Sequence, residues 1–171
     1  FPEFGESLAA QMIGGWQLAA TGVFQTGIPF TVHTTAGFGA SGDFNADGEN
    51  YDVPNAPACG NTISGASKAD FRSGLFSASD FPLPADGTQG NLGRNTFDHP
   101  GYATVDFQLL KRFPIPFPNE TAEMQSRIEA LNGFNRVNLT PTVHNLASGL
   151  FGRSTNSLLP RKFTFGLRLR F

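Results

Sequence analysis

The last ten residues of this 171-residue chain, KFTFGLRLRF, alternate without a break between polar and apolar side chains. Successive side chains of a β-strand point to opposite faces of a sheet, so the pattern predicts a strand with one apolar and one polar face. The apolar positions are Phe163, Phe165, Leu167, Leu169 and Phe171. The polar face carries the cations Lys162, Arg168 and Arg170. Any fold for this chain must therefore give the two faces of one strand different surroundings.

Three more segments alternate in the same way. The first lies in Gly15–Thr35, the second begins at Tyr102 and the third begins at Ala122. The third also fits a short helix, because Met124 and Ile128 have helical spacing. Asn132 and Gly133 would interrupt such a helix early, so the strand is the favoured interpretation. The sequence predicts an all-β, antiparallel arrangement of four long strands.

Composition suits a sheet in lipid better than a soluble domain. Charged residues make up 15% of the chain, against about 25% in typical soluble domains. The chain holds 18 Phe, 20 Gly and 12 Pro, and the last two favour turns. A net charge of −2 gives no basic field for nucleic acid. The single Cys59 cannot form an internal disulfide, and no run of about 18 apolar residues predicts a membrane helix.

The connections between the four strands alternate in length. The second and third strands are joined by the short segment Pro114–Thr121, whereas long polar loops, about 36–100 and 136–160, follow the first and third. Outer-membrane barrels have short periplasmic turns and long external loops, so this pattern predicts a transmembrane β-barrel segment. Residues 1–14 would then be a periplasmic turn or linker, and residues 15–171 the C-terminal barrel strands with their external loops.

The barrel interpretation assigns a solvent to each face. Lipid would cover the apolar face, and the three cations would face a wet interior, where Glu123, Glu129 or Asp106 can meet them. Aromatic residues near the periplasmic boundary would form a girdle: Trp16, Phe113, Phe117 and Phe171. The alternative is a secreted β-sandwich, a binding or adhesion module with a calcium-stabilised loop, because a sandwich strand shows the same alternation.

The closing strand also carries a short motif. Thr164, Gly166, Leu169 and Phe171 follow the pattern polar, glycine, apolar and terminal aromatic. This resembles the signal that the barrel assembly machinery reads in outer-membrane proteins. The resemblance implies that this machinery is a partner and that the chain resides in the bacterial outer membrane.

Longer blocks carry a wider resemblance. GGWQL, TGIPF, NLGRNTFDHPGYATVD and the closing strand together resemble the C-terminal end of Oar-like TonB-dependent receptors. The resemblance implies a barrel of about twenty-two strands with an N-terminal plug and a TonB-binding segment, which this chain does not carry. We therefore expect the chain to supply the last four strands: barrel wall, external loops and closing strand of a transporter. The transported substrate is not implied.

The first long loop contains SGDFNADGENYD, in which oxygen-bearing side chains alternate before a glycine. Such spacing is typical of calcium loops, although Pro54 stands where a bidentate Glu would be. The candidate ligands are Asp43, Asn45, Asp47 and Asp52; the alternative is a polar loop whose Asp and Asn side chains form turns.

No enzyme is expected from this sequence. The histidines, His33, His99 and His144, have no metal-ligand spacing, and no nucleophile elbow accompanies the loop serines. GFGASG, which ends at Gly42, fits a nucleotide-binding glycine pattern, but no helix follows it.

Overall fold

The structure is a computed structural model that describes residues 12–34, 42–58, 65–115 and 122–171. The chain divides into two compact units. Unit 1 comprises residues 1–24, 103–137 and 159–171, and unit 2 comprises residues 25–102 and 138–158. Among the described residues, no helix has both the length and the apolar character needed to span a membrane.

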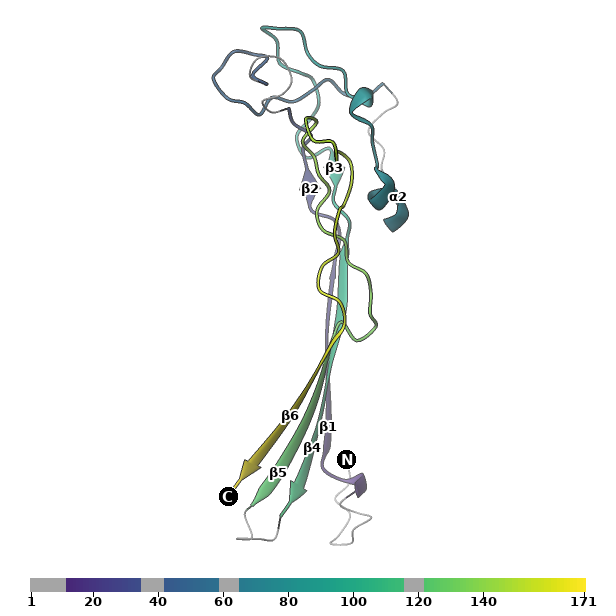
Figure 1. The fold of residues 1–171 in the computed structure, drawn as a ribbon, viewed down its shortest axis with the longest axis vertical. Helices are drawn as coiled ribbons and strands as arrows, with labels where there is room; N and C mark the ends of the chain where they lie inside the picture. The colour runs from purple at the N-terminus through teal and green to yellow at the C-terminus, as the bar shows by residue number, and fades with distance from the viewer. Residues whose placement is uncertain (1–11, 35–41, 59–64, 116–121) are drawn as a thin grey trace. The chain divides into compact units, whose positions relative to one another are not determined.

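Unit 1 is built on a four-stranded sheet. Its strands lie side by side in the order β1 (Trp16–Gln25), β4 (Tyr102–Pro114), β5 (Glu123–Leu131) and β6 (Lys162–Arg170) (Figure 1). The β4–β5 and β5–β6 pairs are antiparallel. The four alternating segments of the sequence are thus confirmed as strands, and the third is a strand rather than a helix. Within the described ranges β1 and β6 each have one sheet neighbour, so the sheet does not close on itself.

The first strand is shorter than the alternation suggested, because β1 ends at Gln25 instead of continuing to Thr35. The physical reason lies at Gly27, where a Cβ atom would come within 1.8 Å of the His99 carbonyl oxygen. This close backbone approach starts a separate two-stranded sheet, in which β2 (Pro29–Phe30) pairs antiparallel with β3 (Phe97–Asp98). The first long strand therefore ends about ten residues before the end of the alternating segment, and the chain continues into unit 2.

The register of the main sheet separates two faces. On one face, the residues of β5 and β6 that pair are mostly apolar: Met124 with Leu169, Ile128 with Phe165 and Ala130 with Phe163. The same row continues onto β4, where the neighbours of these β5 residues are Phe113, Leu109 and Phe107. On the other face the pairs are Glu123 with Arg170, Gln125 with Arg168 and Glu129 with Thr164. We call these the apolar face and the polar face of the sheet. The alternation in the sequence is thus carried across three neighbouring strands.

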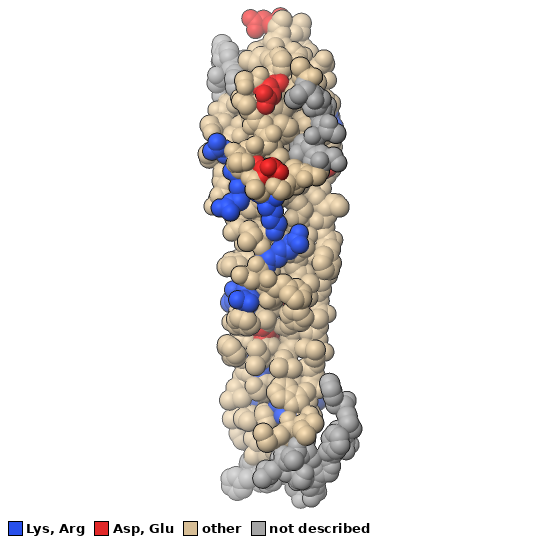
Figure 2. All heavy atoms as spheres, turned by 90° about the vertical axis from the view of Figure 1, so that its right-hand side faces the viewer, with Lys and Arg blue, Asp and Glu red and all other residues tan. Residues whose placement is uncertain are grey.

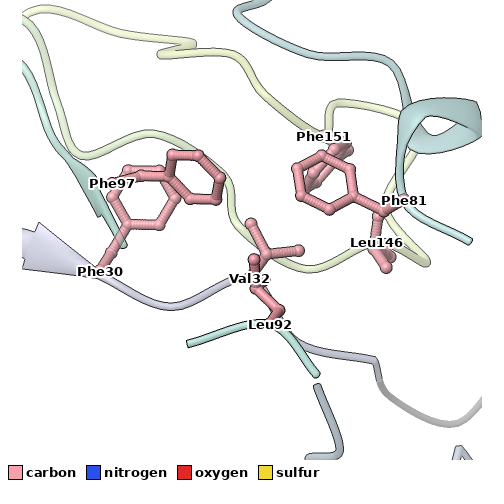
Figure 3. Close-up of a cluster of buried hydrophobic side chains, with 7 residues drawn as sticks. All are labelled: Phe30, Val32, Phe81, Leu92, Phe97, Leu146 and Phe151. Atoms are coloured by element: carbon pink, nitrogen blue, oxygen red, sulfur yellow. The ribbon is translucent and has the colours of Figure 1, made fainter. Parts of the chain in front are cut away.

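Unit 2 has a hydrophobic core, which the sequence analysis did not anticipate for loop segments. Figure 3 shows the core side chains, with Phe97 beside Phe30 and Phe151 beside Phe81. Phe97 also packs against Phe76, with 4.7 Å between ring centroids. The buried cluster consists of Phe30, Val32, Phe81, Leu92, Phe97, Leu146 and Phe151. The two predicted loops therefore fold together around shared aromatic side chains.

Short capped helices and backbone hydrogen bonds complete unit 2. Helix α2 (Lys68–Ser73) and the 3-10 helix η1 (Ala78–Asp80) each begin with a capping box, from Ser67 and Ser77 respectively. The second loop segment joins the first through the Ser154 N–H, which donates to the Phe71 carbonyl, and the Leu146 N–H, which donates to the His33 carbonyl. These bonds, at 2.7 Å and 3.0 Å, tie residues far apart in sequence into one unit.

Candidate bilayer-facing surface and loop sites

The apolar face of the sheet is exposed along the closing strand. Phe165 keeps 74% of its surface exposed and Leu167 keeps 67%, and Phe163 and Leu169 are about half exposed. Burying such a side chain stabilises a protein by roughly 1.5–3 kcal/mol, and this free energy is lost if the side chain stays in water. A β-sandwich would cover this face with a second sheet, and the described residues of unit 1 supply none. Hydrocarbon is the solvent that suits this face.

The polar face carries one ion pair between neighbouring strands and one within β5. The Arg170 guanidinium lies 3.2 Å from the Glu123 carboxylate, its register partner, as the sequence predicted. Glu129 accepts from Gln108 and lies 3.4 Å from the Arg127 Nε. The two arginine side chains are more than half exposed and the two glutamates are partly exposed, so water screens both pairs and each contributes at most about 1 kcal/mol. Long charged side chains on this face require water, which an aqueous barrel lumen would supply.

One cation, Lys111, breaks the pattern by lying on the apolar face. Its register partner is Ser126, and only 3% of its surface is exposed. Its ammonium donates to the carbonyl oxygens of Met12 and Gly14, and it lies 5.1 Å from the ring centroids of both Trp16 and Phe113. Nothing in the sequence predicted this role for Lys111. A lysine whose ammonium contacts backbone carbonyls and aromatic rings near the end of a strand is typical of a membrane interface.

Two of the four predicted girdle aromatics are therefore brought together around Lys111. Trp16 begins β1, and its indole N–H donates to the Met12 carbonyl at 3.0 Å. Phe113 lies near the end of β4, which precedes the short connection. Phe171 directly follows β6 and is exposed, and Phe117, with most of that connection, lies outside the described residues. This end of the sheet is the one that the sequence assigned to the periplasm.

The predicted assembly-signal positions fall on both faces of the closing strand. Thr164 and Gly166 lie on the polar face, Leu169 lies on the apolar face, and Phe171 follows the last strand residue. Gly166 pairs with Arg127, and a Cβ atom at Gly166 would make only ordinary contacts, 3.8 Å or more from the Arg127 side chain. Packing therefore does not demand glycine at this position, and recognition by the assembly machinery stays a prediction.

The acidic loop of unit 2 brings the predicted calcium ligands together, and the Asn45 side-chain amide donates to the Asp47 carboxylate at 2.8 Å. Carboxylate oxygens of Asp43, Asp47 and Asp52 all lie within 4.8 Å of one another. Asp52 is buried and accepts from the Phe44 and Asn45 N–H groups, while Asp43 accepts from the Asp47 and Gly48 N–H groups. These bonds shape the loop by themselves, as the turn interpretation requires. Calcium binding stays a prediction.

Within this loop the pKa of Asp47 is lowered. The main cause is the hydrogen bond that its carboxylate accepts from the Glu49 N–H, and the Asn45 side-chain amide adds to it. Both donors favour the ionised carboxylate, so Asp47 is an anion at neutral pH. The loop therefore presents the ionised Asp47 carboxylate at its surface, close to Asp43 and Asp52.

The three histidines, which are scattered in the sequence, form a cluster in unit 2. The His144 ring centroid lies 4.9 Å from that of His33 and 5.8 Å from that of His99, and His99 stacks on Phe30 at 4.4 Å. The sequence gives no sign of this cluster, because the three residues meet only when the two loop segments pair with each other. The His99 Nδ1 accepts from the Thr142 N–H. In the neutral ring the Nε2 then carries the proton, so this orientation offers no lone pair to a metal.

Charge is sparse on the face of the molecule shown in Figure 2, where uncharged residues cover most of the surface. An antiparallel sheet with an exposed apolar face, a charged opposite face and an aromatic cluster at one end defines the wall of a membrane-spanning β-structure. The chain belongs to the outer membrane beta barrel domain family, whose model matches residues 2–164. The protein is therefore located in the bacterial outer membrane, and its sheet contacts the lipid bilayer.

The match includes unit 2 as well as the strands, and it ends within β6, before Gly166. Comparisons with curated proteins and with solved structures find no match.

The histidine cluster predicts that unit 2 loses stability in acid. Burial, followed by the nearby charge of His144, lowers the pKa of both His33 and His99. Because the folded-state pKa lies below the unfolded value of about 6.5, the unfolded chain binds protons more readily, and stability falls as the pH drops below about 6.5. Hydrogen exchange of the detergent-solubilised protein at pH 7.5 and 5.5 would show weaker protection of unit 2 at the lower pH, and His33→Gln would reduce the difference. Equal protection at both values would contradict this prediction.

The calcium prediction has a direct test in the same unit. Adding CaCl₂ to metal-free protein should raise the thermal midpoint of unit 2, because the cation would offset repulsion among three carboxylates. Asp47→Ala should abolish the shift, whereas Asp86→Ala, an exposed acid outside the cluster, should preserve it. A parent protein that shows no shift would leave the loop with its turn-forming role alone.

Proposed function

We propose that this chain is the C-terminal wall segment of an Oar-like TonB-dependent outer-membrane transporter. In this proposal β1, β4, β5 and β6 are the last four strands of a barrel of about twenty-two. The chain supplies barrel wall, external loops and the closing strand, and we expect it to have a structural rather than a catalytic role. Energy would come through TonB, which contacts parts of the transporter outside this chain.

The observation that carries the proposal is the charged polar face of the sheet. Small barrels fill their interior with packed side chains, whereas wide ones enclose water or a plug. Here Arg127, Glu129, Arg168 and Arg170 extend from two neighbouring strands, which supports a wide, water-filled lumen. The outer edges of β1 and β6 have no partner among the described residues, and open edges do not occur in lipid. Additional strands are thus needed to close the barrel.

The blocks that resemble the receptors fall at structurally distinct places. GGWQL opens β1, beside Lys111 and its aromatic neighbours. TGIPF contains Gly27 and strand β2, where the chain passes from the long sheet into unit 2. NLGRNTFDHPGYATVD contains β3 and the start of β4, where it returns. This distribution supports the proposal, because each block serves a boundary of the strands or the packing of unit 2.

Binding to TonB tests the transporter proposal without knowledge of the substrate. The full-length protein, purified from outer membranes in mild detergent, should form a stoichiometric complex with the periplasmic C-terminal domain of TonB from the same bacterium. Another TonB-dependent transporter of that bacterium serves as the positive control. Absence of a complex where the control binds would reject TonB-dependent transport and leave the outer-membrane barrel itself intact.

The assembly partner is tested by a matched pair of phenylalanines on the closing segment. We expect Phe171→Ala to lower the amount of folded protein in the outer membrane severalfold, because the terminal aromatic is the last element of the signal. Phe163→Ala removes a ring of the same size from the same segment and should have a much smaller effect. Heat-dependent gel mobility of outer-membrane fractions measures both. Equal losses would show that Phe171 contributes only apolar surface.

A further inference from the structure

A groove lies on the apolar face of unit 1, at the end of the sheet where the long connections leave. Ala103 and Val105 of β4 line it between Phe24 of β1 and Phe134, which follows β5. The groove measures about 460 Å³, and its lining is mainly apolar. Phe24 and Phe134 keep 75% and 72% of their surfaces exposed, so the groove is open to whatever solvates this face. Its shape and chemistry suit a flexible hydrocarbon chain.

A cation, Arg136, lines the same groove, and its backbone is held in place. The Asn132 side chain accepts from the Arg136 N–H and donates to the Arg136 carbonyl, each at 2.9 Å. The Asn132 N–H in turn donates to the Asp106 carboxylate on β4 at 2.8 Å. Phe134 packs edge-to-face on Phe107, at 5.4 Å between centroids. Arg136 is thus anchored to the sheet at a fixed place beside the groove.

The backbone of a second cation, Arg161, is held to the same turn. Its N–H donates to the Asn135 side chain at 3.4 Å, and its guanidinium lies 5.4 Å from the ring centroid of Phe163, on the apolar face. The ion pairs described on the sheet, Arg127 with Glu129 and Arg170 with Glu123, include neither Arg136 nor Arg161. Two arginines therefore border exposed apolar surface at one end of the strands.

We propose that this groove binds an acylated, phosphorylated lipid of the outer leaflet. One acyl chain would lie over Ala103 and Val105 between the two phenylalanine rings, and the phosphate would lie beside Arg136 and Arg161. Arginine binds phosphate through paired, charge-assisted hydrogen bonds, and a hydrocarbon chain matches the apolar lining. A sugar or a free anion would match one half of this surface only. Because long connections mark the external side of a barrel, the ligand belongs to the outer leaflet.

The proposal rests on the outer-membrane location and not on transport, so a failed TonB experiment would leave it standing. The test uses full-length protein that has been delipidated in detergent. Native mass spectrometry compares lipid A that carries its phosphates with the same lipid A after enzymatic dephosphorylation. We expect the phosphorylated lipid to bind about tenfold more tightly, as the loss of a charge-assisted pair of hydrogen bonds would give.

Variants locate the site. Arg136→Gln should reduce binding of the phosphorylated lipid to the level of the dephosphorylated one, and Arg136→Lys should retain part of the difference. Val105→Trp should weaken both lipids, because the larger side chain fills the groove. Arg94→Gln removes an exposed cation of unit 2 and should change nothing.

Two results would overturn the proposal. One is equal binding of the two lipids by the parent protein, and the other is parent-like discrimination by Arg136→Gln. Heat-dependent gel mobility shows whether each variant is folded. If the variants fail to fold, the comparison of the two lipids on the parent protein still decides the question.

Discussion

One constraint determines the rest of the structure: the two faces of a single sheet need different solvents. Phe163, Phe165 and Leu167 on one face are exposed, while the opposite face carries charged groups such as Arg168 and Arg170. A protein interior on one side would require a second layer, which the described residues of unit 1 do not supply. Hydrocarbon on one side and water on the other suits both the apolar and the charged side chains of β6. Hydrogen bonds between neighbouring strands pair the backbone N–H and C=O groups, for which lipid offers no partners.

The exceptions to this division fall at the ends of the strands, where a bilayer is no longer uniformly apolar. Lys111 lies on the apolar face close to the short connection, and its ammonium contacts backbone carbonyls and lies near the rings of Trp16 and Phe113. Arg136 and Arg161 border the same face at the opposite end. Cations thus mark both boundaries of the apolar face, and each is combined with aromatic rings. A bilayer with polar headgroups on both sides accounts for this arrangement.

The sequence predicted the strands well because their signal is local. Alternation from Tyr102 or from Lys162 requires no knowledge of distant residues, and β4 and β6 begin at those positions. The end of β1 at Gln25 was missed because it depends on Gly27 approaching His99, far along the chain. Unit 2 was missed for the same reason. Its core and its histidine cluster arise from pairing between two segments that read, one at a time, as polar loops. Convergence of Asp43, Asp47 and Asp52 was predictable, because those ligands share one short stretch.

The most direct test is to measure which solvent, lipid or water, surrounds two adjacent residues of the closing strand, β6. Single spin labels would replace Phe165, on the apolar face, and Thr164, on the polar face, in protein reconstituted into lipid vesicles. Dissolved oxygen, which concentrates in hydrocarbon, should relax the label at 165, and a water-soluble nickel chelate should not. The label at 164 should show the reverse. A label at 165 that responds to the nickel chelate as strongly as the label at 164 would contradict the assignment of this face to lipid.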